Sequence, residues 1–90
     1  MPRILFTEQY EKRAKRFAKR HPDMLRQYEK TLLLLEANPH HPSLRLHTLK
    51  GKLSDVYSVS INLSYRISME FLIETDMIIP IDIGTHDEVY

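Results

Sequence analysis

Arg66, His86 and Tyr90 are the residues of this sequence whose types and spacing could do chemistry together. Cutting RNA without a metal ion needs a base that takes the proton of the 2′-hydroxyl, a cation that holds the phosphate, and an acid that protonates the leaving 5′-oxygen. Histidine titrates near neutral pH and can serve either proton-transfer role. Arginine supplies a permanent cation with a fork of donors, and tyrosine can stack on a base or share in proton transfer. The set therefore predicts chemistry on a phosphate group.

Alternation predicts the neighbours of Arg66. This residue falls on the polar side of a segment in which apolar and polar residues alternate, and the serines expected near it are Ser58, Ser60 and Ser68. If the alternation continues past Ile83, one side of the last strand faces the same way as Arg66. The residues on that side are Asp82, Gly84 and His86. Gly84 could equally mark a bulge or a close approach of a ligand to the backbone.

Each histidine also has a simpler interpretation. A histidine that follows a strand is usually exposed or hydrogen-bonded, which would leave His86 without a chemical role, and loop histidines such as His47 are common. His40 and His41 are adjacent, so their side chains diverge unless the loop bends sharply, and this disfavours a metal site built on them and His47. We expect no metal and no other cofactor.

Two helices are predicted in the first half of the chain. A short strand at residues 3–6 precedes Thr7, which is a good N-cap for a helix to about residue 20. A second helix is expected after Pro22, with Asp23 as its cap, and it ends at Asn38 and Pro39. The apolar positions at helical spacing are Tyr10, Ala14, Phe17 and Ala18, then Leu25, Tyr28, Leu32 and Leu35. The short break between the helices predicts an antiparallel hairpin, and residues 40–52 are expected to form a loop.

Three strands are predicted in the second half. Residues 56–63 and 65–71 alternate between apolar and polar and are joined by a tight turn at residues 62–64. Residues 77–83 form the third, with Ile79, Ile81 and Ile83 on the apolar face. Pro80 cannot donate to a ladder, so this strand should lie at an edge or be locally bulged. The prediction is one α+β domain over residues 1–90, in β-α-α-β-β-β order, whose mostly antiparallel sheet carries a helical hairpin on one face. The other face is polar and expected to be free.

Composition narrows the classes of function. The chain has 90 residues and no cysteine, which excludes disulfides, thiol nucleophiles and cysteine-bound metals. No apolar run has the length of a signal peptide or a membrane helix, so we expect a cytoplasmic protein without a membrane partner. Residues 1–52 carry 12 Lys and Arg against 5 Asp and Glu, a net +7, whereas residues 53–90 carry a net −6. Such asymmetry indicates that the basic part meets a polyanion or an acidic protein, unless it is only a solvated helix face.

Several segments together resemble the RelE/ParE superfamily of bacterial toxin-antitoxin systems, and in particular its mRNA interferase branch with the YafQ-like toxins. They are "LLLLEANPHHPSL", "LHTLKGKL", "VYSVSINLSYRISMEF" and "IDIGTHDEVY". The likeness runs over nearly the whole chain. It implies a RelE-like fold and an endoribonuclease that cuts mRNA on the ribosome through 2′-hydroxyl attack. It also implies a cognate antitoxin, bound in a hetero-oligomeric complex.

The resemblance implies roles for single residues. Arg66 matches the arginine that RelE-like enzymes place against the phosphate, and His86 matches the position of a catalytic histidine in YafQ-like toxins. Tyr90 matches their C-terminal aromatic residue. His47 aligns with a loop histidine that takes part in proton transfer. Lys50 and Lys52, beside it, carry over only as cations that contact RNA.

Ser58 and Ser60 depart from the pattern of the family. They are the residues at RNA-binding positions where RelE carries two lysines, and YafQ-like toxins have a further histidine near Ser60. Losing those cations should weaken stabilisation of the transition state, so the chain would cut slowly or depend more on its histidines. Two alternatives stay open: a ParE-like inhibitor of DNA gyrase, and a toxin fold that is catalytically weak and only binds its antitoxin.

Overall fold

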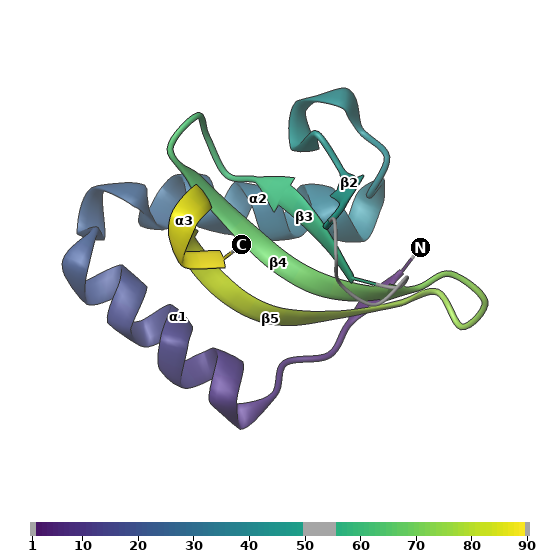
Figure 1. The fold of residues 1–90 in the computed structure, drawn as a ribbon, viewed down its shortest axis with the longest axis horizontal. Coiled ribbons are helices and arrows are strands. Elements are labelled where there is room, and N and C mark those ends of the chain that lie inside the picture. Colours follow the sequence, from purple (N-terminus) through teal and green to yellow (C-terminus); the bar gives the residue numbers. More distant parts are fainter. Residues whose placement is uncertain (1, 50–55, 90) are drawn as a thin grey trace.

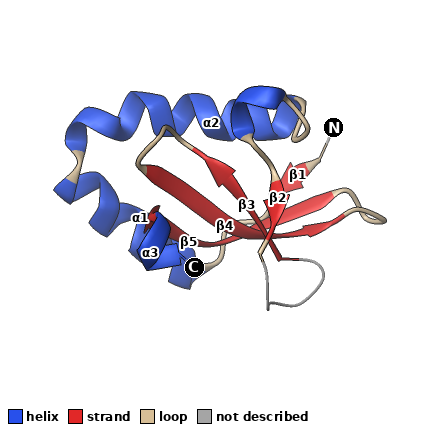
Figure 2. Cartoon of the chain, turned by 45° about the horizontal axis from the view of Figure 1, so that its top comes forward, coloured by secondary structure: helices blue, strands red, loops and turns tan. Residues whose placement is uncertain are grey.

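The computed structural model describes residues 2–49 and 56–89, which form one α+β unit around a five-stranded sheet (Figures 1 and 2). The elements in chain order are β1 (Arg3–Ile4), α1 (Glu8–Arg20), α2 (Leu25–Ala37), β2 (His47–Thr48), β3 (Val56–Ser60), β4 (Tyr65–Leu72), β5 (Met77–Thr85) and α3 (His86–Val89). Short 3-10 turns at Pro22–Met24 and Pro42–Leu44 lie between them. The predicted order is confirmed, and two elements are added to it, β2 and α3.

The first helix forms as its sequence predicts. The Thr7 hydroxyl accepts a hydrogen bond from the Tyr10 amide at 3.1 Å, which satisfies one of the amides that a helix start leaves without a partner. The helix buries Tyr10 and Phe17 on its apolar side. Its basic residues occupy the remaining surface, as amphipathic spacing requires.

The second helix begins differently from the prediction. Its N-cap is Met24, which makes no side-chain capping bond, so the prediction that Asp23 caps the helix is wrong. The 3-10 turn that starts at Pro22 runs directly into the helix, and the Leu25 amide bonds to the Pro22 carbonyl instead. Leu25 is 44% exposed although the apolar stripe included it, because it lies at this junction. Figure 1 shows α1 and α2 meeting at the turn and diverging from it, with α2 passing behind the sheet and α1 running down beside β5.

The sheet has the strand order β1-β5-β4-β3-β2. Only β1 and β5 are parallel, and the other neighbours are antiparallel, so the prediction of a mostly antiparallel sheet is confirmed. The turn at residues 62–64 is also confirmed, since the Asn62 side chain accepts hydrogen bonds from the Ser64 and Tyr65 amides at 2.8 Å each. The core between sheet and helices contains fully buried Leu35, Val59 and Ile67, and a side chain of this size contributes roughly 1.5–3 kcal/mol when it is buried.

Strand β5 contains the irregularity that Pro80 predicts. The ladder pairs Ser68 with Asp82 but Met69 with Pro80, so Ile81 is an extra residue on β5. The bulge changes which side chains face the helices. Ile78 and Pro80 are buried, whereas Ile79 and Ile81 are only half-buried, so the prediction that they share the apolar face with Ile83 is wrong.

The C-terminal half of β5 is also an open edge. Strand β1 pairs with Met77 and Ile78, and within residues 2–49 and 56–89 no strand pairs with the backbone beyond them on that side. Helix α1 covers this edge, where Arg13 Nη1 donates to the Ile81 carbonyl at 2.9 Å. In residues 2–49 and 56–89, no helix has the length and apolar character needed to cross a membrane.

Candidate functional site

The strand register brings polar residues from four strands onto one side of the sheet. Directly paired residues of neighbouring strands point to the same side. One row across the sheet is His47, Ser58, Ser68 and Asp82, and the next is Ser60, Arg66 and Gly84. The predicted neighbours of Arg66 are therefore placed beside it. His47 and Arg66 are separated by two strand spacings across the sheet and by two residues along the strands. Standard sheet dimensions therefore put their Cα atoms roughly 12 Å apart, a distance that the two side chains and a phosphate group can bridge.

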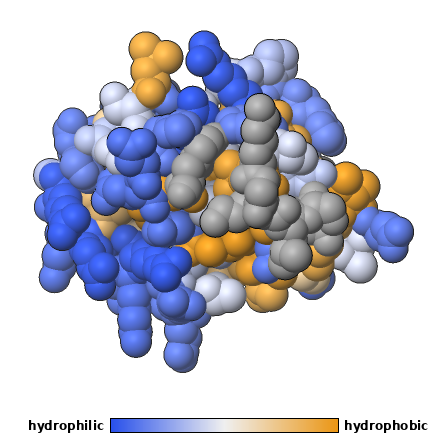
Figure 3. All heavy atoms as spheres, in the orientation of Figure 1, coloured by the Kyte–Doolittle hydropathy of each residue, from blue (hydrophilic) through white to orange (hydrophobic). Residues whose placement is uncertain are grey.

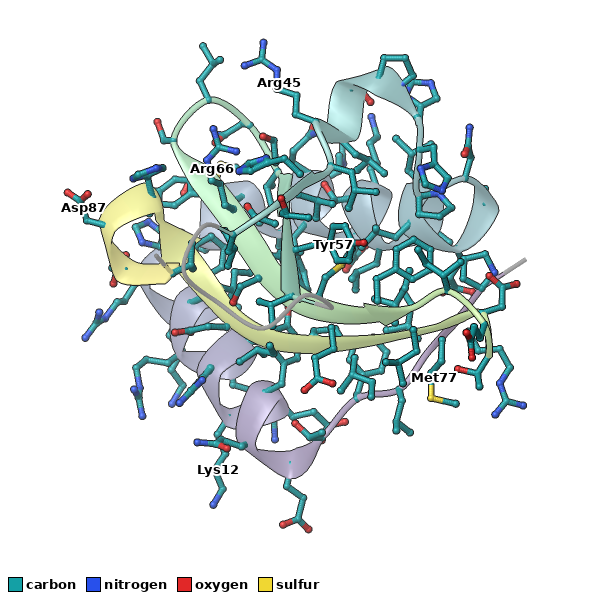
Figure 4. The ribbon with its side chains drawn as sticks, turned by 45° about the vertical axis from the view of Figure 1, so that its right-hand side comes forward. Lys12, Arg45, Tyr57, Arg66, Met77 and Asp87 are labelled. Atoms are coloured by element: carbon teal, nitrogen blue, oxygen red, sulfur yellow. The ribbon has the colours of Figure 1, made fainter. Side chains whose placement is uncertain are left out.

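Arg66 lies in the middle of this surface and is half-buried. Its Nη1 donates a hydrogen bond to the Ser60 hydroxyl at 3.0 Å, across the β3–β4 ladder. This bond uses one of the five donors of the guanidinium and limits its rotation. Figure 4 shows Arg66 at the same end of the molecule as Arg45 and Asp87, and far from Lys12 and Met77.

His47 is an exposed residue of strand β2, so the prediction of a loop is wrong at this position. It pairs with Ser58, which makes it part of the sheet. Its Nδ1 is 2.9 Å from the Arg45 carbonyl oxygen. A carbonyl can only accept, so Nδ1 carries the hydrogen, and in the neutral ring the lone pair is on Nε2. Arg45 adopts a left-handed backbone with φ of 50°, which costs strain for a residue with a Cβ. The ring is thus fixed in one tautomer by local backbone geometry.

His86 is the first residue of α3 and not the last of β5. The ladder places Asp82 and Gly84 on the side of Arg66, as predicted, and the chain then turns into a single helical turn. That turn contacts β4 and β5 and lies in front of them in Figure 1. The His86 side chain is 59% exposed, and its Nδ1 lies 3.5 Å from Asp87 Oδ1, an ion pair when the ring is protonated. His86 is accessible to a ligand at the end of the polar surface.

Gly84 leaves room for a side chain of the same molecule. A Cβ built on Gly84 would be 2.8 Å from Glu88 Oε1, closer than such atoms approach each other. The sequence allowed a bulge or a ligand at this glycine, and the structure shows the Glu88 carboxylate there instead. This carboxylate accepts a hydrogen bond from the Thr85 amide at 2.9 Å. That bond and a side-chain hydrogen bond with Thr85, helped by the nearby guanidinium of Arg20, hold the pKa of Glu88 below its ordinary value.

The prediction of a free polar face is wrong at three of its serines. Ser58 is 0% exposed, Ser60 7% and Ser68 4%. Buried hydroxyl groups do not meet solvent directly, so the side chains accessible on this surface are longer ones such as His47 and Arg66. Three further predicted site residues, Lys50, Lys52 and Tyr90, lie outside the described residues.

Basic residues surround a cavity at the edge of this surface. It lies between α1 and the β5–α3 junction, has a volume of about 330 Å³, and is lined by Arg13, Arg16, Arg20 and His21 among others. Arg13 lies 3.9 Å from Asp82 Oδ2, and the Glu88 carboxylate also lines the cavity, so part of this positive charge is compensated. Figure 3 shows hydrophilic side chains gathered over α1 at the lower left. The basic asymmetry of the sequence is therefore an exposed feature of the fold.

The histidines at residues 40 and 41 have structural contacts. The His40 ring lies 6.0 Å from the ring of Phe71, and His41 Nδ1 is 2.9 Å from the Ser43 hydroxyl. Across the described ranges, 2–49 and 56–89, no group of three or more His, Asp or Glu side chains is arranged to hold a metal ion.

Two contributors to the site were not predicted from the sequence. Glu88 had a signal, since Thr85 followed three residues later by a glutamate is the pattern of a capping box at a helix start. The Arg45 carbonyl had none, because its contact with His47 depends on a left-handed backbone at a residue that rarely adopts one.

Comparison with solved structures identifies the fold. A metal-bound toxin from Helicobacter pylori superposes with a TM-score of 0.80 at 22% identity, covering 100% of both chains. YafQ from E. coli superposes at 0.79 and 18% identity, over 100% of this chain and 99% of that one. A chain of the E. coli DinJ-YafQ toxin-antitoxin complex superposes with a TM-score of 0.72 at 22% identity, over 99% of this chain and 97% of that one. No protein-family model and no curated protein sequence matches the chain. The predicted RelE-like α+β fold is confirmed.

Proposed function

We propose that this chain is the toxin of a type II toxin-antitoxin system and that it cuts mRNA on the ribosome as a metal-independent endoribonuclease. The observation that carries the proposal is the pair of polar rows on one side of the sheet. The rows contain His47 and the strand residue Arg66, and α3, which follows β5 directly, begins with His86; this arrangement supports the proposal. The fold shared with YafQ supports the toxin role.

His47 is suited to the role of base. Its Nδ1–H is directed to the Arg45 carbonyl, so the lone pair of Nε2 can take the proton of a 2′-hydroxyl. The 2′-oxygen then attacks phosphorus, and the bond from phosphorus to the 5′-oxygen breaks. The products are a 2′,3′-cyclic phosphate and a free 5′-hydroxyl once that oxygen is protonated.

Arg66 and His86 serve the other two roles. The guanidinium of Arg66, oriented by Ser60, stabilises the negative charge that develops on the phosphate. His86, whose protonated ring is paired with Asp87, donates the proton to the leaving 5′-oxygen. In this assignment Tyr90 stacks on a base, and Lys50 and Lys52 contact the RNA backbone. Ser60 acts on the RNA through Arg66, and Ser58 supports the strand that carries His47.

The partners follow from the surface of the molecule. We assign mRNA and ribosomal RNA to the polar surface and the basic helix α1, since phosphate contacts are made by exposed Lys and Arg. A cognate antitoxin would cover part of the same basic surface in a hetero-oligomer, as charge complementarity favours. The DinJ-YafQ complex supports a partner of this kind.

A toxin fold that only binds its antitoxin is the second candidate. Ser58 and Ser60 favour it, because they are buried neutral residues where the implied family pattern has cations. The deciding experiment is expression of the chain alone in bacteria, with mapping of transcript ends and translation. We expect growth arrest with new mRNA ends in ribosome-bound transcripts, and no arrest for His86→Ala or His47→Ala.

The matched control is His40→Ala, which removes an exposed histidine outside the polar rows. It should remain as toxic as the parent. Growth arrest with intact mRNA and a DNA-damage response would point to gyrase inhibition and refute the proposal. The absence of any arrest at high expression would favour the second candidate.

A further inference from the structure

Helix α3 is too short to be stable without contacts to the rest of the protein. It has four residues, fewer than an isolated helix needs to be stable in water. It nevertheless carries His86, two residues after Gly84, the ladder partner of Arg66, and the proposed function gives His86 the transfer of a proton. Val89 anchors the far end of the turn, since it is only 9% exposed. The near end, where His86 lies, must be fixed by another contact.

The Glu88 carboxylate makes that contact. It accepts the Thr85 amide at 2.9 Å, so it closes the turn across His86 and Asp87. This is the reciprocal arm of a capping box, in which the third residue of a helix bonds back to the residue before it. The bond constrains the backbone on both sides of His86. Asp87, in contrast, lies beside His86 with a fully exposed side chain.

Gly84 is the residue that makes this contact possible. Any Cβ there would be 2.8 Å from Glu88 Oε1 and 3.1 Å from Glu88 Cβ. The glutamate therefore reaches the Thr85 amide only because residue 84 has no side chain. Gly84 is also paired with Arg66 in the ladder, so the capped turn is built directly against the strand that holds the phosphate-binding cation.

We propose that Glu88 is a positioning residue: by capping Thr85 in the space left by Gly84, it holds His86 in the place from which it transfers a proton beside Arg66. The proposal rests on the proposed function for its catalytic consequence. Its structural part, the capped turn, stands independently of any activity.

The test compares Glu88→Ala with Glu88→Gln and with the control Glu74→Ala, an exposed glutamate in the turn between β4 and β5. Loss of a capping bond should increase amide exchange at Thr85 roughly fivefold in Glu88→Ala and shift the ring signals of His86 in NMR spectra. Glutamine keeps the acceptor oxygen, so Glu88→Gln should stay close to wild type. Ribosome-dependent cleavage by Glu88→Ala should lose about tenfold in kcat with little change in KM, because a displaced proton donor lowers the rate of the chemical step.

Gly84→Ala provides a second, independent arm. Its methyl group should push the Glu88 carboxylate away and reproduce the effect of Glu88→Ala. The double variant Gly84→Ala with Glu88→Ala should be no worse than Glu88→Ala, since the clash partner is gone. Additive losses in the double variant would overturn the proposal.

The outcomes separate this proposal from the proposed function. Unchanged Thr85 exchange and unchanged His86 signals in Glu88→Ala would refute the capping role even if the wild type cuts mRNA. Altered signals with kcat unchanged would refute the positioning role. If the wild type cuts nothing, the proposed function fails, and the NMR comparison alone decides whether Glu88 fixes the turn.

Discussion

Replacing Arg66 tests the site most directly, because the structure separates its chemical role from its structural one. Arg66→Gln removes the cation from the polar surface while keeping a polar side chain. If Arg66 stabilises charge that develops on the phosphate, its loss should lower kcat by roughly a hundred- to a thousandfold, or about 2.7–4 kcal/mol, as for other groups with this role. The cost to folding should be smaller. The substitution leaves the Ser60 hydroxyl, 7% exposed, without its donor, which costs about 1–3 kcal/mol.

Ser60→Ala is the matched variant, since it removes the same 3.0 Å hydrogen bond from the other side and keeps the guanidinium. It should reduce stability by about 0.5–1.5 kcal/mol and reduce kcat much less than Arg66→Gln, because the cation remains. The assay is ribosome-dependent cleavage of a defined mRNA, with urea denaturation of each variant and measurements well below both unfolding midpoints. Cleavage by folded Arg66→Gln within threefold of wild type would refute the assignment. Equal losses in the two variants would show that orientation of the strand, and not the cation, is what matters.

Three further predictions concern the pH dependence of stability and the backbone near His47. Burial, together with the neighbouring Tyr28, raises the pKa of Tyr10, and their hydroxyls are hydrogen-bonded at 3.0 Å. Because the pKa of Tyr10 is higher in the folded state than in the unfolded one, the contribution of its neutral hydroxyl to stability is present below about pH 10 and is lost as the pH rises. The free energy of unfolding of Tyr10→Phe, measured by urea denaturation, should therefore fall less at alkaline pH than that of wild type. The pKa of Glu88 is lowered, first by the Thr85 amide, so its contribution is present above the unfolded pKa and disappears as the pH falls through the folded one. The difference in Tm between wild type and Glu88→Ala should accordingly shrink below about pH 4, and a difference that grows there would contradict the capping bond. Arg45→Gly removes the strain of a left-handed backbone and keeps the carbonyl that orients His47. Urea denaturation should therefore show a stability that is unchanged or higher by up to about 1 kcal/mol. A loss of more than about 1 kcal/mol would mean that the Arg45 guanidinium supports the fold.

The local elements of this protein were predictable from residue types and their spacing. Thr7 begins α1 because its hydroxyl accepts an amide that the helix start leaves unpaired, and proline and asparagine end α2 for equally local reasons. Alternation of period two determines which residues of β3 and β4 share a side, and so it predicted that Arg66 would stand near Ser60. These properties depend on residues that are close in the chain.

Contacts between distant segments decided the rest. The alternation of β5 breaks at Ile81, because Pro80 cannot donate a hydrogen bond to the ladder and the strand bulges beside it. The bulge changes which side chains of β5 are buried. His47 entered the sheet because β3 offered a free edge, which no pattern around residue 47 reveals.

The sequence by itself determined helices α1 and α2, strands β1, β3, β4 and β5, and the side of the sheet that carries Arg66. The tertiary structure decided that the serines beside it are buried and that Glu88 fills the space at Gly84. The reason is physical: periodicity sets the direction of a side chain, but burial and distance depend on what other parts of the chain pack against it.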